Sequence, residues 1–110
     1  MHPDQEINRD LQIFEHTLQQ ILMQKQSLHL EQNELSNALS ELNKASDPVF
    51  RVIGSVMIKA DKNDLKKELD EKKRLIDLRI GAMEKQESLI EGRIVDIRKN
   101  LSHSPSVNSK

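Results

Sequence analysis

Apolar residues recur along the first part of the chain in alternating steps of four and three residues. These steps average 3.5 residues, which is the period of a coiled coil rather than the 3.6 of a straight helix. Because proline disfavours helix at the residue before it, the pattern should stop ahead of Pro48. We therefore predict a helix over residues 7–45 with one apolar stripe. This first seam, in which only Lys25 and Gln32 are polar, consists of Ile7, Leu11, Phe14, Leu18, Ile21, Lys25, Leu28, Gln32, Leu35, Leu39 and Leu42.

A second stretch follows the same rule and predicts a helix over residues 62–101. Asp61 suits its start, because a carboxylate can accept a hydrogen bond from a free N–H of the first turn. Gly81 and Gly92 weaken a helix by about 1 kcal/mol each relative to Ala, but both lie off the stripe. We expect residues 102–110 to form a disordered tail. The second seam, with Lys73 and Glu87 as its polar members, consists of Leu69, Lys73, Ile76, Ile80, Met83, Glu87, Ile90, Ile94, Ile97 and Leu101.

The two seams mirror each other when one helix is folded back on the other. In the register that matches the seams, Leu18 packs on Ile90. Lys25 then lies in the pair of facing seam residues next to the pair that contains Glu87. Such a match favours one long antiparallel coiled coil within the chain. Polar seam residues can fix register and orientation, but a lysine can also extend its ammonium group to water while the glutamate is merely tolerated. Both interpretations of Lys25 and Glu87 stay open at this point.

The residues at the bend, 49–59, predict a β-hairpin. They are rich in β-branched residues, and Gly54-Ser55 suits a two-residue turn, with Gly first as type II′ requires. The two faces would carry Val49, Ile53, Val56 and Ile58 on one side, and Phe50, Val52 and Met57 on the other. An isolated hairpin this apolar is marginal in water and prone to aggregate unless it is covered. The expected oligomerisation residues, covered by hairpins of other copies or related subunits, are Phe50, Val52, Ile53, Val56, Met57 and Ile58.

The composition favours a coiled coil over a round core. The chain of 110 residues has no Trp, Tyr or Cys, and 32% of its residues are charged, so we expect one domain over residues 1–110. Its 17 basic and 18 acidic residues are mixed, which argues against the basic face that nucleic acid requires. No signal peptide is recognisable, and no apolar run reaches the ~20 residues that span a bilayer. We expect a cytoplasmic protein that binds neither nucleic acid nor membrane.

No residue pattern indicates catalysis. Three glycines cannot make a Gly-rich phosphate loop, and no core is available to form a pocket that perturbs a pKa. We therefore expect no enzyme activity, no metal and no cofactor. The histidines form no metal-binding motif and fall off the seams or in the tails, and they are His2, His16, His29 and His103.

Short motifs in the hairpin and the second helix match a known pattern. They are Val52-Ile53-Gly54, Val56-Met57-Ile58-Lys59-Ala60-Asp61-Lys62, Leu65-Lys66-Lys67-Glu68-Leu69 and Met83-Glu84-Lys85-Gln86-Glu87. With two equal helices around a single hairpin, about residues 7–101 resemble a prefoldin beta-type subunit of the archaeal kind. The alpha type carries two hairpins. The Ser-rich tail departs from the simplest pattern of that family.

The resemblance implies an ATP-independent molecular chaperone that holds unfolded proteins. In the archaeal form, two alpha-type and four beta-type subunits would join their hairpins into a double β-barrel. The six coiled coils would capture unfolded protein clients between their tips and hand them to a group II chaperonin.

Clients are expected at the free ends of the coiled coil, where pairing frays because no further layers cap it. The expected client-binding residues are Ile7, Leu11, Phe14, Ile94, Ile97 and Leu101. A structural coiled-coil scaffold or adaptor subunit is the alternative function. A client-recognition arm of a nucleic-acid-binding complex is a further alternative, which the near-neutral charge does not support.

Overall fold

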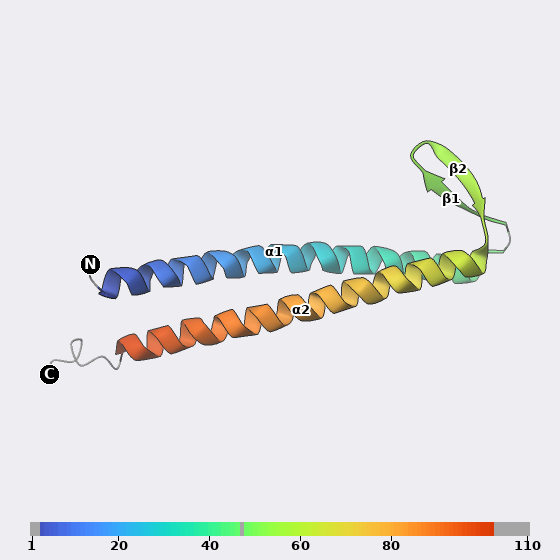
Figure 1. Ribbon diagram of the computed structural model, residues 1–110. Helices are drawn as coiled ribbons and strands as arrows, with labels where there is room; N and C mark the ends of the chain where they lie inside the picture. Colours follow the sequence, from blue (N-terminus) through green and yellow to red (C-terminus); the bar gives the residue numbers. More distant parts are fainter. Residues whose placement is uncertain (1–2, 47, 103–110) are drawn as a thin grey trace. The chain divides into compact units, whose positions relative to one another are not determined.

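The computed structural model describes residues 3–46 and 48–102, which form two helices with a β-hairpin between them in the chain (Figure 1). The elements are α1 (Pro3–Lys44), β1 (Val49–Ile53), β2 (Val56–Ala60) and α2 (Lys62–Ser102). The predicted fold class is thereby confirmed. α1 begins at Pro3 rather than at residue 7, since proline suits the first position of a helix and the seam marks only where the apolar stripe starts. Of the predicted tail, Ser102 ends α2, and the rest lies outside the described residues.

Hydrogen bonds satisfy free backbone groups at the two helix ends that flank the hairpin. At the end of α1, the Ala45 N–H donates to the Glu41 carbonyl at 3.0 Å. The Lys62 ammonium, from the first turn of α2, donates to the Ala45 carbonyl at 2.7 Å. At the start of α2, a carboxylate oxygen of Asp61 accepts a hydrogen bond from the Asp64 N–H at 2.9 Å. The predicted N-cap at Asp61 is therefore confirmed.

The described residues group into two compact units. In the first unit, residues 3–26 of α1 and 81–102 of α2 run antiparallel. An ion pair joins the two segments, with 2.7 Å between the Arg98 guanidinium and the Glu15 carboxylate. The buried members of the seams in this unit are Ile21 and Ile94.

The second unit holds residues 27–80, and with them the hairpin. Here the Gln32 side chain donates to the Asp77 carboxylate of α2 at 2.6 Å. The buried side chains of this unit are Leu28, Leu42, Val49, Ile76 and Ile80. Four of them are seam residues, and the fifth, Val49, is the first residue of β1.

The two predicted seams are confirmed by burial, because every seam position is buried or half-buried. The register contact of Leu18 with Ile90 stays a prediction, although both side chains are half-buried. The exposed large apolar side chains of the helices all lie off the seams, and they are Ile13, Leu22, Met23, Leu30, Leu75, Leu78, Leu89 and Val95.

The strands of the hairpin pair antiparallel, with Val49 opposite Ala60 and Ile53 opposite Val56. Gly54 has a φ of 62°, and no non-glycine residue in the described part of the chain has a positive φ. A positive φ at the first turn residue alone fits the predicted type II′ turn and excludes type I′, which needs it at both. Strand alternation confirms the two predicted faces and adds Arg51 to the face of Ile53.

Candidate functional site

The hairpin exposes a contiguous apolar surface. Its six predicted oligomerisation residues are all exposed, with exposed fractions between 45% for Ile58 and 67% for Met57. Because the sheet has only two strands, each strand also has an outer edge with backbone N–H and C=O groups that a further strand can pair with. Apolar patches of this kind mark sites of protein–protein contact. The surface is suited to binding another protein.

One charged residue interrupts this apolar hairpin and ties it to α2. The two terminal nitrogens of Arg51 donate to the two carboxylate oxygens of Glu68, each at 2.7 Å. Through these hydrogen bonds the Arg51 guanidinium holds the pKa of the Glu68 carboxyl below its usual range. Sequence reasoning missed this pair. The available signal was a single arginine in an otherwise apolar strand, with acidic residues in the helix that follows.

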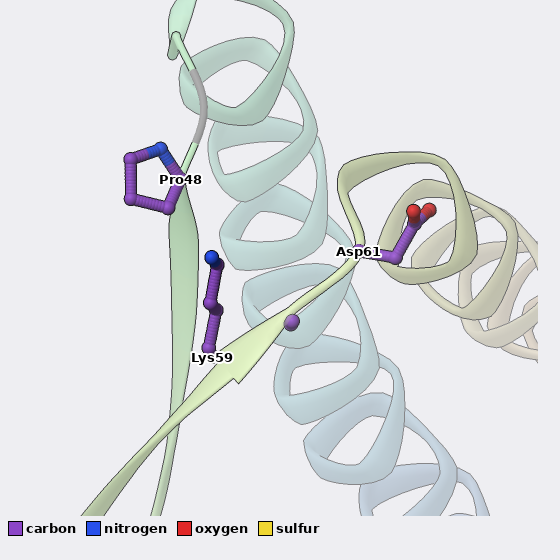
Figure 2. Close-up of a pocket in the computed structure, with 4 residues that line it drawn as sticks. Pro48, Lys59 and Asp61 are labelled. Atoms are coloured by element: carbon purple, nitrogen blue, oxygen red, sulfur yellow. The ribbon is translucent and has the colours of Figure 1, made fainter.

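A hollow of about 580 Å³ lies at the base of the hairpin, lined by Pro48, Lys59, Ala60 and Asp61. Figure 2 shows the Lys59 side chain extending towards Pro48, while the Asp61 carboxylate turns to the first turn of α2, which it caps. With its carboxylate engaged in capping, Asp61 is not placed as a base beside Lys59. The hollow therefore extends the contact surface of the hairpin and does not form a catalytic constellation.

The polar seam residues Lys25 and Glu87 meet in the first unit. The Lys25 ammonium lies 2.8 Å from a Glu87 carboxylate oxygen and 3.6 Å from one of Glu84. The hydrogen bond that Lys25 donates to the Glu87 carboxylate raises the pKa of Lys25. The predicted approach of Lys25 to Glu87 is confirmed. The two side chains are only 16% and 17% exposed, so the lysine is held by a partner across the seam and does not extend freely to water.

The predicted client-binding residues lie together in the first unit, on both of its helical segments. Five of them are half-buried and Ile94 is buried, with 6% of its surface exposed. Their role in binding stays a prediction. The same unit also exposes apolar side chains that lie off the seams, which are Ile13, Leu22, Met23, Leu89 and Val95. Because these lie off the seams, they can contact another protein without any opening of the helix pair.

The histidines within the described residues lie on exposed helix faces. His16 is hydrogen-bonded to the Gln20 amide and His29 to that of Gln32, each at 3.2 Å. His2 and His103 lie outside the described residues. In residues 3–46 and 48–102, no three His, Cys, Asp or Glu side chains gather as a metal site would require. Neither α1 nor α2, as far as they are described, has an apolar stretch that could cross a membrane.

An apolar β-hairpin carried by an antiparallel helix pair defines a class of coiled-coil subunit built for contact with other proteins. The family model described as prefoldin subunit matches residues 5–104 of this chain. The chain belongs to the prefoldin family.

Archaeal beta subunits are among its relatives. The prefoldin subunit beta of Sulfurisphaera tokodaii is 31% identical over 94 residues, which cover 84% of this chain and 75% of the relative. That of Archaeoglobus fulgidus is 30% identical over 101 residues, covering 90% and 87%. The crystal structure of the prefoldin beta subunit from Thermococcus strain KS-1 matches with a TM-score of 0.84 at 27% identity, over 94% of this chain and 96% of that one. The resemblance to beta-type subunits is confirmed.

Proposed function

We propose that this chain is a beta-type subunit of a cytoplasmic prefoldin hexamer that holds unfolded proteins without ATP. Its family makes it a subunit of a prefoldin-type chaperone that works in a complex with other subunits. The proposal adds the mechanism: the coiled-coil ends capture unfolded protein clients, and the complex transfers them to a group II chaperonin. Copies of this chain and alpha-type subunits make up the complex.

The observation that carries the proposal is the exposed apolar hairpin. Val52, Val56 and Met57 are each more than half exposed, although side chains of this kind are commonly buried. The hairpin also has two unpaired strand edges, which favour the addition of strands from neighbouring subunits. Hairpins of several subunits would cover each other's apolar faces and satisfy each other's edges. Assembly through the hairpin leaves the far ends of the helices available to clients.

Clients are proposed to bind at Ile7, Leu11, Phe14, Ile94, Ile97 and Leu101. Because these seam residues are half-buried or buried, they reach a client only when the end of the helix pair opens. The exposed neighbours Ile13 and Val95 can make a first contact before it opens. Burying one such side chain contributes ~1.5–3 kcal/mol, so a single coiled coil binds weakly. Several coiled coils in one complex bind tightly together, because the second and later contacts occur at high effective concentration.

Two measurements test the proposal. The purified chain is mixed with an archaeal alpha-type prefoldin subunit, and the mass of the complex is determined by native mass spectrometry. Light scattering then follows the aggregation of a heat-unfolded reporter enzyme in the absence of ATP. We expect a hexamer that suppresses aggregation more strongly than this chain alone.

A chain that stays monomeric with its partner would contradict the proposal. A hexamer that assembles without suppressing aggregation would indicate the scaffold function instead.

A further inference from the structure

Arg51 is the only charged residue of β1, and it contacts a residue of α2, outside the hairpin. In the strand register it lies opposite Ile58, on the face that also carries Val49 and Ile53. Its guanidinium meets the Glu68 carboxylate of α2 through two parallel hydrogen bonds of 2.7 Å. The pair thus joins the hairpin to the helix that follows it.

The geometry of this contact fixes an orientation as well as a distance. A planar guanidinium and a planar carboxylate joined by two bonds have little freedom to rotate against each other. The Lys72 ammonium, 3.9 Å from a Glu68 oxygen, adds a second positive charge beside the carboxylate. The lowered pKa of Glu68 agrees with a carboxylate that stays charged in this contact. Close by in sequence, Lys62 ties the start of α2 to the Ala45 carbonyl at the end of α1.

The two faces of the hairpin differ in exposure, and the pair of Arg51 and Glu68 lies on the side of the less exposed face. On the Arg51 face, which is tied to α2, Val49 is buried, and Ile53, Val56 and Ile58 are 55%, 56% and 45% exposed. By strand alternation, the opposite face carries Phe50, Val52 and Met57, with exposed fractions of 49%, 67% and 67%. Lys59, opposite Phe50, adds the one charge on that face.

We infer that Arg51 and Glu68 are positioning residues that hold the hairpin so that its Phe50, Val52 and Met57 face meets the apolar hairpin of a neighbouring subunit. The inference rests on the proposed assembly and names the face that it uses. Its physical basis is preorganisation: a hairpin already held in the bound orientation does not lose that freedom on association. An ion pair this exposed contributes little to the stability of a fold, so its loss should be felt in assembly and not in helix unfolding.

The test compares Arg51→Gln with Arg74→Gln in the full chain. Arg74 is the matched control. It also donates two hydrogen bonds to a carboxylate, that of Glu71, at 2.6 and 3.0 Å, but both residues lie within α2. The chain has no cysteine, so Ser55→Cys and Asp70→Cys provide the two sites for spin labels on the hairpin and the helix. Electron paramagnetic resonance measures the label distance, and sedimentation velocity measures assembly with a purified archaeal alpha-type prefoldin subunit.

We expect Arg51→Gln to broaden the distance distribution and to raise the concentration for half-assembly by roughly fivefold, a change typical of one broken contact pair. Glu68→Gln should have the same two effects. The double variant should assemble no more weakly than either single variant, because either substitution already breaks the contact between Arg51 and Glu68. Arg74→Gln should change neither measurement. An unchanged distance distribution, or a broadened one with unchanged assembly, would overturn the inference. If the unsubstituted chain fails to assemble, the proposed function is wrong, and the label distances still decide whether the pair holds the hairpin.

Discussion

At the scale of single residues, the seam contains one enclosed ion pair whose role differs from that of the apolar positions. Lys25 and Glu87 expose 16% and 17% of their side chains, against 37% and 38% for Arg51 and Glu68. Removing one partner of an enclosed pair leaves a charge without compensation, whereas replacing both by apolar residues is often neutral or stabilising. The pair is therefore suited to selecting one register of the helix pair more than to strengthening it.

We predict that Glu87→Leu lowers the thermal midpoint of the helix pair, and that Lys25→Leu with Glu87→Leu brings it back to the unsubstituted value or above. The double variant should lose its unique register, because leucine seams tolerate a shift that the ion pair forbids. Circular dichroism follows the midpoint, and a nitrogen–proton NMR spectrum should then show more than one peak for many amides.

The exposed pair of Glu15 and Arg98 provides the control, since its side chains are more than half exposed. Replacing both by Leu should not multiply the NMR peaks. A single set of peaks from the Lys25→Leu, Glu87→Leu chain would refute the register role.

At the scale of elements, the helices and the hairpin depend on different partners. Each helix buries its seam against the other within this chain, as the exposures of Leu28 and Ile80, 5% and 6%, show. The hairpin buries Val49, half-buries Ala60 and leaves its larger apolar residues exposed. The helix pair thus has a core of its own, while the hairpin presents most of its apolar surface to solvent.

Val56→Asp should abolish assembly while leaving helicity nearly intact. Val56 lies on the face opposite Phe50, but a strand added at the outer edge of β2 would lie beside it whichever face packs. A carboxylate enclosed there without a partner costs several kcal/mol, while the helices keep their own buried seams. Ile58→Asp should behave in the same way. Circular dichroism measures the helix content, and sedimentation velocity measures assembly.

Ser55→Asp at the exposed turn is the matched control and should still assemble. A variant at Val56 that loses its helix signal together with assembly would show that the coiled coil depends on the hairpins.

The glycines of the two elements should respond in opposite directions to alanine. Gly81 lies inside α2, and a Cβ built there meets no heavy atom within 4 Å, so Gly81→Ala should stabilise the helix by ~1 kcal/mol. Gly54 has the positive φ that alanine disfavours, so Gly54→Ala should destabilise the hairpin by ~1–2 kcal/mol. Urea unfolding of the assembled complex measures both changes. Equal effects of the two substitutions would contradict the type II′ turn.

At the scale of the whole molecule, the proposed function makes client binding depend on assembly. The hairpin residues are exposed in the isolated chain, and the end residues of the helix pair are half-buried. A single helix pair offers a client few accessible side chains, so tight binding requires several chains in one complex. In the proposed function, assembly through the hairpin therefore supports client binding at the ends of the helices.

Removing residues 1–11 and 98–110 together should separate these two parts. The hairpin is untouched, so a hexamer should still form, but suppression of client aggregation should fall to the level of a reaction without chaperone. Native mass spectrometry and light scattering provide the two measurements. A chain shortened only by residues 103–110 is the control, and it should keep full suppression if the seam residues bind clients. Full suppression after the larger deletion would place client binding elsewhere.

The sequence by itself determined the seams, the hairpin and its turn, because each depends on local periodicity or on one residue's backbone preference. It also determined the meeting of Lys25 with Glu87, since two mirrored seams allow one antiparallel register. Only the tertiary structure decided that Arg51 binds Glu68. That contact depends on the orientation of the hairpin against α2, and no spacing along the chain encodes this orientation. The same holds for the burial of Val49 and the exposure of Phe50, neighbours in one strand. Strand alternation assigns them to opposite faces, but it does not tell that Val49 is buried while Ile53, Val56 and Ile58 on the same face stay exposed.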